Sequence, residues 1–162
     1  SEDRILPDLF RAIEANSALE VRNPAATRPW QHVLDVLAGY LSYAEALVYD
    51  TGGTVPNALN FGPRTAEAKP VEWLVDRAIA QVRDRGIDAA DWKNISDDGP
   101  RETAALALDA SLATRSLGWA PSLTQEDAID WTVDWHAGAM GGKPARELVL
   151  EQIGRFSEWT SG

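Results

Sequence analysis

The chain has 162 residues, of which 44% are hydrophobic and 25% are charged, and its formal net charge is −10. This length suits one compact domain or a portion of a larger enzyme, and the ordinary composition excludes intrinsic disorder and collagen-like structure. No run of about 18 apolar residues occurs, and the N-terminus lacks the apolar stretch of a signal peptide. The absence of cysteine excludes disulfides and thiolate metal sites, and we expect a cytoplasmic protein.

The acidic balance argues against nucleic-acid binding, which usually requires a basic stripe on the surface. An anionic small ligand is still permitted, because a ligand responds to the charge close to it and not to the total. All but three of the 15 basic residues are arginines, whose planar guanidinium offers paired donors to phosphate or carboxylate oxygens. Genome composition produces the same bias, so the arginines alone do not identify a ligand.

In the first half of the chain, apolar residues at helical spacing predict two helices, over residues 4–16 and 33–49. The second is long and amphipathic. Between them we expect a short extended piece at residues 19–21, followed by an irregular segment with two prolines at residues 22–29. Residues 58–62 are predicted to form a short buried strand that is closed by a Gly-Pro pair.

In the second half, the pattern predicts four helices and two short strands. The helices cover residues 71–85, 111–117, 124–139 and 146–156, and the strands cover residues 91–96 and 102–108. Gly118 marks the end of one helix, and Thr124 with Asp127 resembles a capping box that opens the next. The whole pattern predicts a helix-rich α/β fold with a few short strands, without the succession of strands and helices needed for a complete parallel sheet.

The sequence shows no self-contained active site. It contains no G-x-G-x-x-G or G-x-x-x-x-G-K motif for phosphate binding and no G-x-S-x-G nucleophile turn. The two histidines, His32 and His136, are not spaced as a zinc pair, and no tyrosine has a lysine four residues later. We therefore expect no catalytic residue, no metal and no bound NAD in this chain alone.

Polar residues beside apolar elements are the remaining candidates for ligand binding. Arg28, which precedes the second helix, either holds a phosphate by two charge-assisted hydrogen bonds or is an ordinary surface arginine. Asn60 either offers its amide to a ligand at the end of the predicted strand or satisfies the backbone of a turn. Arg101 and Glu102 suit an anion and a hydroxyl group, or form a loop ion pair worth about 0–1 kcal/mol. His32 is interpreted as a capping or core-edge imidazole.

Motifs in a consistent order resemble the C-terminal half of the extended short-chain dehydrogenases that act on nucleotide sugars. They are Asp3-Arg4-Ile5-Leu6-Pro7-Asp8, Arg22-Asn23-Pro24, Arg28-Pro29-Trp30-Gln31-His32-Val33, Asn60-Phe61-Gly62-Pro63, Pro100-Arg101-Glu102, Leu117-Gly118-Trp119-Ala120-Pro121 and Trp131-Thr132-Val133-Asp134-Trp135. Within this superfamily the chain is most similar to the CDP-glucose 4,6-dehydratases. Distinctive segments are Ala68-Lys69-Pro70-Val71-Glu72-Trp73 and Leu148-Val149-Leu150-Glu151-Gln152-Ile153.

The resemblance implies a set of substrate-binding residues. Arg28 is expected to hold the diphosphate of the nucleotide sugar, and Asn60 to line the same region. Glu102 is expected to approach the ribose, with Arg101 beside it as a candidate second phosphate contact. The residues expected to border the base are Arg4, Ile5, Val21, Arg22 and Asn23.

The resemblance also implies that the chemistry is carried outside this chain. In the family, NAD oxidises C4 of the hexose, water is eliminated across C5–C6, and hydride returns to C6. The glycine-rich turn and the Tyr-x-x-x-Lys pair that serve this chemistry are not in the sequence. We therefore expect residues 1–162 to be the C-terminal substrate-binding portion of such a lyase, without its N-terminal NAD-binding Rossmann portion and inactive alone.

The expected partners are CDP-glucose, which the complete enzyme converts to CDP-4-keto-6-deoxyglucose, the N-terminal half, and a second subunit in a homodimer. No nucleic acid and no membrane is expected. Two alternatives stay open. The chain is the same portion of another nucleotide-sugar epimerase or dehydratase with a UDP, GDP or dTDP substrate, or it is a stand-alone nucleotide-sugar binding module without catalysis.

Overall fold

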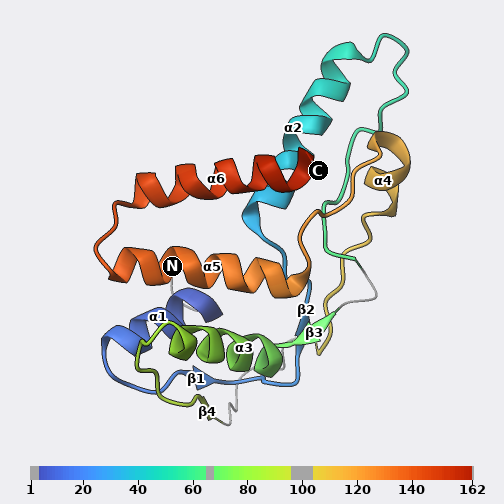
Figure 1. Cartoon of the computed structure of the whole chain (residues 1–162). Coiled ribbons are helices and arrows are strands. Elements are labelled where there is room, and N and C mark those ends of the chain that lie inside the picture. The colour runs from blue at the N-terminus through green and yellow to red at the C-terminus, as the bar shows by residue number, and fades with distance from the viewer. Residues whose placement is uncertain (1–3, 65–67, 96–103, 162) are drawn as a thin grey trace.

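The computed structural model describes residues 4–64, 68–95 and 104–161. Within these residues the chain forms six helices and four strands of two residues each (Figure 1). The helices are α1 (Ile5–Glu14), α2 (Val33–Tyr49), α3 (Val71–Asp84), α4 (Ser111–Leu117), α5 (Gln125–Met140) and α6 (Ala145–Ser161). The strands are β1 (Glu20–Val21), β2 (Thr27–Arg28), β3 (Lys69–Pro70) and β4 (Lys93–Asn94). The predicted helix-rich α/β fold is confirmed, and none of the described helices is long and apolar enough to cross a membrane.

The main hydrophobic core lies between α1, α3 and α5 (Figure 1). Its buried side chains are Leu9, Phe10, Leu19, Val21, Leu74, Val75, Ala78, Ile79, Val82, Ala89, Ile129 and Val133. Beside this core the Arg77 guanidinium on α3 donates to both carboxylate oxygens of Asp130 on α5, over 3.0 and 2.7 Å. The apolar face predicted for the helix at residues 71–85 is thus the face that α3 buries.

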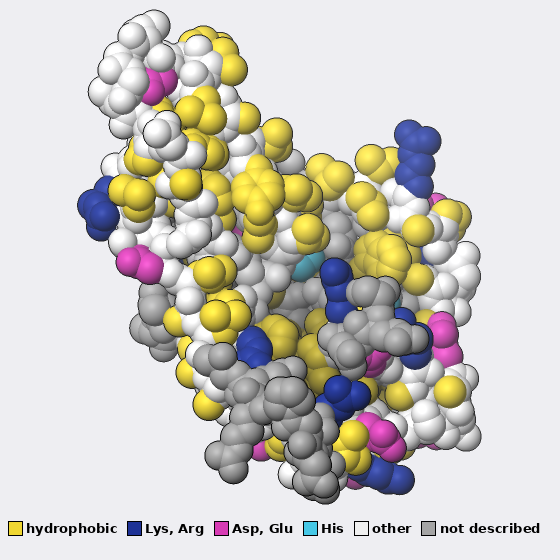
Figure 2. All heavy atoms as spheres, turned by 180° about the vertical axis from the view of Figure 1, so that it is seen from behind, with side chains coloured by type: hydrophobic (Ala, Val, Ile, Leu, Met, Phe, Trp, Pro, Cys, Tyr) yellow, Lys and Arg dark blue, Asp and Glu magenta, His cyan; other side chains and the backbone are white. Residues whose placement is uncertain are grey.

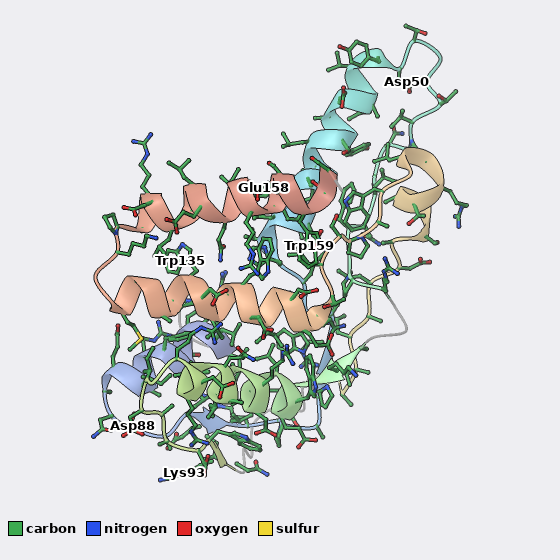
Figure 3. All side chains as sticks on the ribbon, viewed as in Figure 1. Asp50, Asp88, Lys93, Trp135, Glu158 and Trp159 are labelled. Atoms are coloured by element: carbon green, nitrogen blue, oxygen red, sulfur yellow. The ribbon has the colours of Figure 1, made fainter. Side chains whose placement is uncertain are left out.

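α6 packs against α5 on the side away from α3 (Figure 1). The Arg155 guanidinium on α6 lies over the ring of Trp131 on α5, 4.0 Å from its centroid. Trp159, near the end of α6, donates its indole N–H to the Ser122 carbonyl oxygen over 3.2 Å (Figure 3). α6 continues beyond its predicted end at residue 156, and this added part carries Trp159, which contacts the segment before α5.

Two small sheets hold the loops to the helices. β1 pairs with β4 in parallel, and β2 pairs with β3 in antiparallel, with Arg28 opposite Lys69. The second pair stays short because Pro29 and Pro70 adjoin these residues, and proline has no N–H to donate to a ladder. The sequence predicts an irregular segment here, which the structure corrects to a strand at Thr27–Arg28.

The strands predicted farther along the chain are shortened or not formed. The strand predicted at residues 91–96 is reduced to β4. The one predicted at residues 102–108 makes, within its described part, a single bridge from Ala105 to β2. The strand predicted at residues 58–62 is wrong: this segment pairs with no strand in the described part, although Phe61 is buried. It packs against residues of α2 and α4, and helices offer no backbone groups for a ladder.

α2 extends away from the body of the molecule, with α4 beside it (Figure 1). The sequence predicts both helices with the boundaries observed. Phe61, Ala113 and Trp119 form a second, smaller core next to them. Gly39 allows the close approach of α2, since a Cβ atom there would lie 2.4 Å from the Phe61 ring. The buried residues of α2 are Asp35 and Gly39, whereas many of its apolar side chains are exposed.

The helix start predicted at Thr124 and the helix end predicted at Gly118 are both observed. The Asp127 N–H donates to the Thr124 hydroxyl over 3.1 Å, and the Thr124 N–H donates to the Asp127 carboxylate over 3.2 Å, which completes the capping box. Gly118 ends α4 at a φ of 67°, in the left-handed region that favours glycine. After α2, the Asp50 carboxylate at the end of the projecting helix accepts the N–H of Val55 over 2.8 Å (Figure 3).

Candidate functional site

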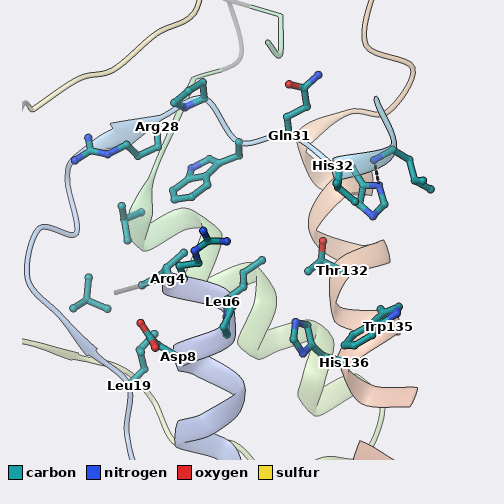
Figure 4. Close-up of a pocket in the computed structure, with 18 of the residues that line it drawn as sticks. Arg4, Leu6, Asp8, Leu19, Arg28, Gln31, His32, Thr132, Trp135 and His136 are labelled. Carbon is teal, nitrogen blue, oxygen red and sulfur yellow. Dashed lines mark hydrogen bonds between the residues drawn. The ribbon is translucent and has the colours of Figure 1, made fainter. Parts of the chain in front are cut away.

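A cavity of about 1010 Å³ lies where α1, α5, α6 and the start of α2 meet the loop of residues 19–32 (Figure 4). This volume is at the upper end of the range of small-molecule sites, about 300–1,000 Å³. In Figure 2 it is the hollow around a histidine, with hydrophobic side chains on both sides and basic side chains at its lower edge. Its size and mixed lining make this cavity the candidate ligand site.

The structure brings together most of the residues that the sequence nominates for ligand binding. Those that line the cavity are Arg4, Ile5, Val21, Arg22, Asn23 and Arg28. Asn60 is not among them, and it is exposed. The structure therefore does not place Asn60 in the lining of the cavity that Arg28 lines, and residues 58–62 pack near α2 and α4 instead of forming a strand. Arg101 and Glu102 lie outside the described residues.

β2 and the turn after it position Arg28 at the cavity. Its Nη1 donates to the carbonyl oxygen of Thr27 over 2.9 Å, and its backbone pairs with Lys69 across the sheet. The indole N–H of Trp30 donates to the Lys69 carbonyl oxygen over 3.1 Å and fastens the turn to β3. Because Arg28 and Trp30 are both half-buried and held, they lose less conformational freedom when a ligand binds.

The cavity gathers basic side chains within an acidic chain. Its arginines are Arg4, Arg22 and Arg28. Two carboxylates also line it, but that of Asp8 forms an ion pair with Arg11, which lies outside the cavity, and the other belongs to Glu20. A guanidinium group can donate two parallel hydrogen bonds to two phosphate oxygens. Cavity walls of low dielectric constant strengthen the positive field of the arginines inside the cavity, even though the net charge of the chain is negative. The arrangement can therefore receive an anionic ligand.

α5 supplies a wall of the cavity that the sequence motifs do not reveal. Thr132, Trp135 and His136 line it from one side of the helix (Figure 4). His136 stacks on Phe10 of α1 with ring centroids 4.2 Å apart, and Trp135 meets its edge at 5.1 Å. Burial lowers the pKa of His136, although the Glu14 carboxylate acts in the opposite direction, so the imidazole is neutral at pH 7. Their i, i+3, i+4 spacing is the sequence signal that groups these residues on one side of a helix.

His32 lies at the N-terminus of α2 and also lines the cavity. Its Nδ1 accepts the Leu34 N–H over 3.3 Å, which caps the helix. Burial and, to a smaller extent, the nearby Arg155 guanidinium together lower the pKa of His32 to about 4. Its ring meets the edge of Trp131 at 5.7 Å. The interpretation of His32 as a capping, core-edge imidazole is confirmed.

Asp35 connects α2 to the segment before α5. Its carboxylate is buried and accepts the N–H groups of Ser122 over 2.7 Å and Leu123 over 3.3 Å. Burial raises the pKa of Asp35, and the two backbone N–H groups oppose this change. The carboxylate thus ties α2, whose start lines the cavity, to the segment before α5, and nothing in the sequence motifs indicates this role.

The described residues do not fit a dinucleotide site or a metal site. A dinucleotide phosphate lies at the N-terminus of a helix that a parallel strand enters through a glycine-rich turn. Among the described strands, β3 alone leads directly into a helix, and it is antiparallel and reaches α3 through Lys69-Pro70-Val71, without glycine. The described part of the chain also holds no group of three or more His, Asp or Glu residues suited to a metal ion.

The sequence matches no protein-family model. It is similar over 161 residues to the CDP-glucose 4,6-dehydratase of Salmonella typhimurium, with 37% identity. The match covers 99% of this chain and 44% of that enzyme, so the chain spans less than half the length of its relative. The resemblance carried by the sequence motifs is confirmed.

Solved structures of nucleotide-sugar enzymes share the fold. The UDP-glucose-4-epimerase of Stenotrophomonas maltophila, with bound NAD and formylated UDP-arabinopyranose, has a TM-score of 0.66 and 21% identity over 86% of this chain and 41% of the epimerase. The dTDP-glucose 4,6-dehydratase of Bacillus anthracis, in complex with NAD, has a TM-score of 0.62 and 19% identity over 83% of this chain and 39% of that enzyme. The predicted helix-rich α/β fold class is confirmed, and the chain shares its fold with part of each of these enzymes.

Proposed function

We propose that this chain is the substrate-binding portion of a CDP-glucose 4,6-dehydratase and that its cavity binds the CDP moiety. One observation carries the proposal. Six residues expected to touch the nucleotide, from three separate segments of the chain, line a single cavity in a chain 37% identical to such an enzyme. In this proposal the complete lyase converts CDP-glucose to CDP-4-keto-6-deoxyglucose, and a separate Rossmann portion carries NAD and the catalytic residues.

Electrostatics supports the diphosphate assignment. A nucleoside diphosphate brings negative charges that would be repelled by a chain of net charge −10 unless basic groups lay close to them. Arg28 is the best-positioned of the cavity arginines, because β2 and the Trp30 hydrogen bond hold its segment. Hydrogen bonds to charged groups contribute about 1.5–3 kcal/mol each, enough for one arginine to dominate the affinity.

The base is assigned to the part of the cavity near the start of α1 and the end of β1. Arg4 and Ile5 line the cavity there, and so do Val21 at the end of β1 and Arg22 and Asn23 after it. Backbone groups and short polar side chains in such a loop can read the edge of a base, while the apolar members cover its faces. Solved neighbours are in complex with formylated UDP-arabinopyranose and with UDP-glucuronic acid, and another is a dTDP-glucose 4,6-dehydratase, so a uridine or thymidine nucleotide is the alternative ligand.

Binding of nucleotides to the purified 162-residue chain tests the proposal. We expect isothermal titration calorimetry to detect CDP and CDP-glucose, with weaker binding of UDP, GDP and dTDP. Arg28→Ala should weaken CDP binding by about 10–150-fold, the equivalent of one lost charged contact of about 1.5–3 kcal/mol. Arg28→Lys should weaken CDP binding by less than Arg28→Ala, since lysine keeps the positive charge but lacks the planar pair of donors.

The matched control is Arg146→Ala, which removes an exposed arginine outside the cavity and should leave CDP binding unchanged. An equal effect of both substitutions, or tighter binding of another nucleotide than of CDP, would contradict the assignment. The pure chain should also form no keto sugar from CDP-glucose. Turnover by the mass-verified chain would show that the catalytic groups are not carried elsewhere.

A further inference from the structure

Trp159, near the end of α6, lies outside the nucleotide cavity, yet it contacts two groups that hold the start of α2. Its side chain is half-exposed and is not part of the cavity lining. Its ring meets that of Trp131 edge to face, with centroids 6.0 Å apart, and its N–H donates to the Ser122 carbonyl oxygen over 3.2 Å (Figure 3). One aromatic and one polar contact thus fix the orientation of a side chain that is half in solvent.

One route from Trp159 to α2 runs through Trp131 of α5. The buried indole of Trp131 meets the imidazole of His32, which caps α2, edge to face at 5.7 Å. α6 also holds Trp131 in two further ways. The Gln152 amide donates to its carbonyl oxygen over 2.6 Å, and the Arg155 guanidinium lies 4.0 Å from its ring centroid. The position of the His32 ring therefore depends on how α6 holds Trp131.

A second route runs through the backbone of Ser122. Its carbonyl oxygen accepts the Trp159 N–H, and its own N–H donates to the Asp35 carboxylate over 2.7 Å. Asp35 lies in the first turn of α2 and is buried, and its other carboxylate oxygen accepts the Leu123 N–H over 3.3 Å. A buried carboxylate that loses its hydrogen-bond partners costs free energy. The start of α2 is therefore expected to move together with the segment that Trp159 holds.

The two routes meet at the start of α2, directly after the loop that carries Arg28. This loop is fastened at two points, Trp30 by its hydrogen bond to Lys69 and His32 by its contact with Trp131. The stretch between Arg28 and His32 is short, and Pro29 fixes one of its φ angles, so it has little freedom to absorb a shift at His32. The position of Arg28 therefore depends on both fastenings.

We propose that Trp159 is a positioning residue for nucleotide binding: it holds the start of α2 where the preceding loop presents Arg28 to the diphosphate. This inference rests on the proposed function and adds to it a residue outside the cavity. Neither Trp159 nor its direct partners Trp131 and Ser122 line the cavity, so its effect on binding passes through the residues that they hold. An arginine that is held in place loses less conformational freedom when the ligand binds.

Calorimetric titration of the full 162-residue chain with CDP tests the assignment. Trp159→Ala removes both contacts and should raise the dissociation constant of CDP about three- to thirtyfold. Trp159→Phe keeps an aromatic ring against Trp131 but has no N–H for Ser122, so its loss of affinity should be smaller. The matched control is Leu150→Ala, which removes an exposed apolar side chain of the same helix that lies outside the cavity lining. This control should leave CDP affinity unchanged.

A double-mutant cycle with Arg28→Ala separates positioning from a general loss of stability. Because Trp159 acts by placing the Arg28 guanidinium, Trp159→Ala should change the dissociation constant of CDP less than about twofold in a chain that already lacks this guanidinium. Two independent effects would instead multiply, since substitutions at sites that do not interact add in free energy. Multiplied effects would show that Trp159 does not act through Arg28.

Hydrogen–deuterium exchange in the absence of nucleotide gives a readout that does not depend on the ligand. Trp159→Ala should speed the exchange of backbone amides in residues 30–36 at least about threefold relative to Leu150→Ala, because the start of α2 loses both fastenings to α6. The amides of α3, which packs in the main core, should keep their protection in both variants.

Unchanged CDP affinity in a folded Trp159→Ala chain, multiplied effects in the cycle, or unchanged exchange at the start of α2 would each overturn the inference. A loss in Trp159→Phe equal to that in Trp159→Ala would overturn it as well, since the ring contact would then contribute nothing. If Trp159→Ala does not fold, Trp159→Phe is used in the same three measurements.

The two proposals fail separately. A parent chain that binds no CDP contradicts the proposed function, and the exchange experiment still tests both routes from Trp159 to α2. Normal CDP binding that Trp159→Ala leaves intact contradicts the positioning role alone.

Discussion

At the scale of single residues, the environment of His32 decides its charge. The imidazole is 4% exposed and lies against Trp131. Its burial and the nearby Arg155 guanidinium both disfavour its protonated form. His32 thus acts as a neutral cap and a wall of the cavity.

This charge state predicts a pH dependence of stability. The pKa of His32 is about 4 in the folded chain and about 6.5 when unfolded, so the unfolded state takes up the proton first as the pH falls. Stability contributed by the neutral imidazole is present above pH 6.5 and is lost progressively between pH 6.5 and 4. Between pH 6.5 and 4, the free energy of unfolding of the chain with His32 should fall by about 3 kcal/mol more than that of His32→Asn. This variant keeps a capping side chain but has no imidazole to protonate.

Urea unfolding of both proteins at several pH values between 4 and 7.5 measures this difference. Asp35 is present in both proteins, so its own titration cancels when the two are subtracted. A difference in unfolding free energy that stays constant with pH would show that His32 is not titrated by unfolding.

Residue types in a loop are a partial guide to the site. Arg28 and Arg22 lie at the cavity as the resemblance implies, because short segments around β1 and β2 carry them there. Asn60 does not, since its place depended on a strand that does not form. The sequence did not indicate that Trp135 and His136 line the cavity. Which side of a helix faces a cavity depends on how the helix packs against other elements, and the sequence motifs do not show this packing.

At the scale of elements, glycine decides how closely α2 approaches the smaller core. A Cβ atom on Gly39 would lie 2.4 Å from Cδ1 of Phe61, whereas a Cβ atom on Gly154 in α6 would meet nothing within 4 Å. Alanine favours both helices equally through its higher helix propensity. The two glycines therefore form a matched pair that isolates the effect of packing.

We expect Gly154→Ala to raise the free energy of unfolding by about 0.5–1 kcal/mol, since it removes backbone freedom from the unfolded chain without a clash. The free energy of unfolding of Gly39→Ala should be about 1–3 kcal/mol lower than that of Gly154→Ala, because the extra methyl group must displace the Phe61 ring. Chemical denaturation measures both. Equal effects of the two substitutions would show that α2 does not pack closely on Phe61.

Helices were more predictable than strands for a physical reason. A helix is held by hydrogen bonds within four residues, and the capping box of Thr124 and the αL Gly118 are equally local. A strand exists only when another strand lies beside it. Residues 58–62 have the composition of a strand, but in the described part they have α2 and α4 as neighbours.

At the scale of the whole molecule, the two hydrophobic cores differ in size. Twelve buried side chains form the core between α1, α3 and α5, whereas three form the one beside α2 and α4. Local opening costs less free energy where fewer buried contacts must be broken. The part of the chain that carries α4 and most of α2 is therefore the less stable one.

Hydrogen–deuterium exchange with mass spectrometry should detect this difference. We expect backbone amides in the second half of α2 and in α4 to exchange roughly tenfold or more faster than those of α3 and α5. Exchange in α1 should follow α3, since both bury side chains in the larger core. Uniform protection over all helices would contradict the division into two cores.

By itself, the sequence determined the helices, their caps and the resemblance to a dehydratase, because each depends on neighbouring residues or on motifs read in order. The tertiary structure alone decided which candidates meet. It joined the loops around Arg22 and Arg28 to Trp135 of α5, about a hundred residues away in the chain. It also decided that the apolar pattern of α2 faces outward, since periodicity shows that a helix has an apolar face but not which body covers it.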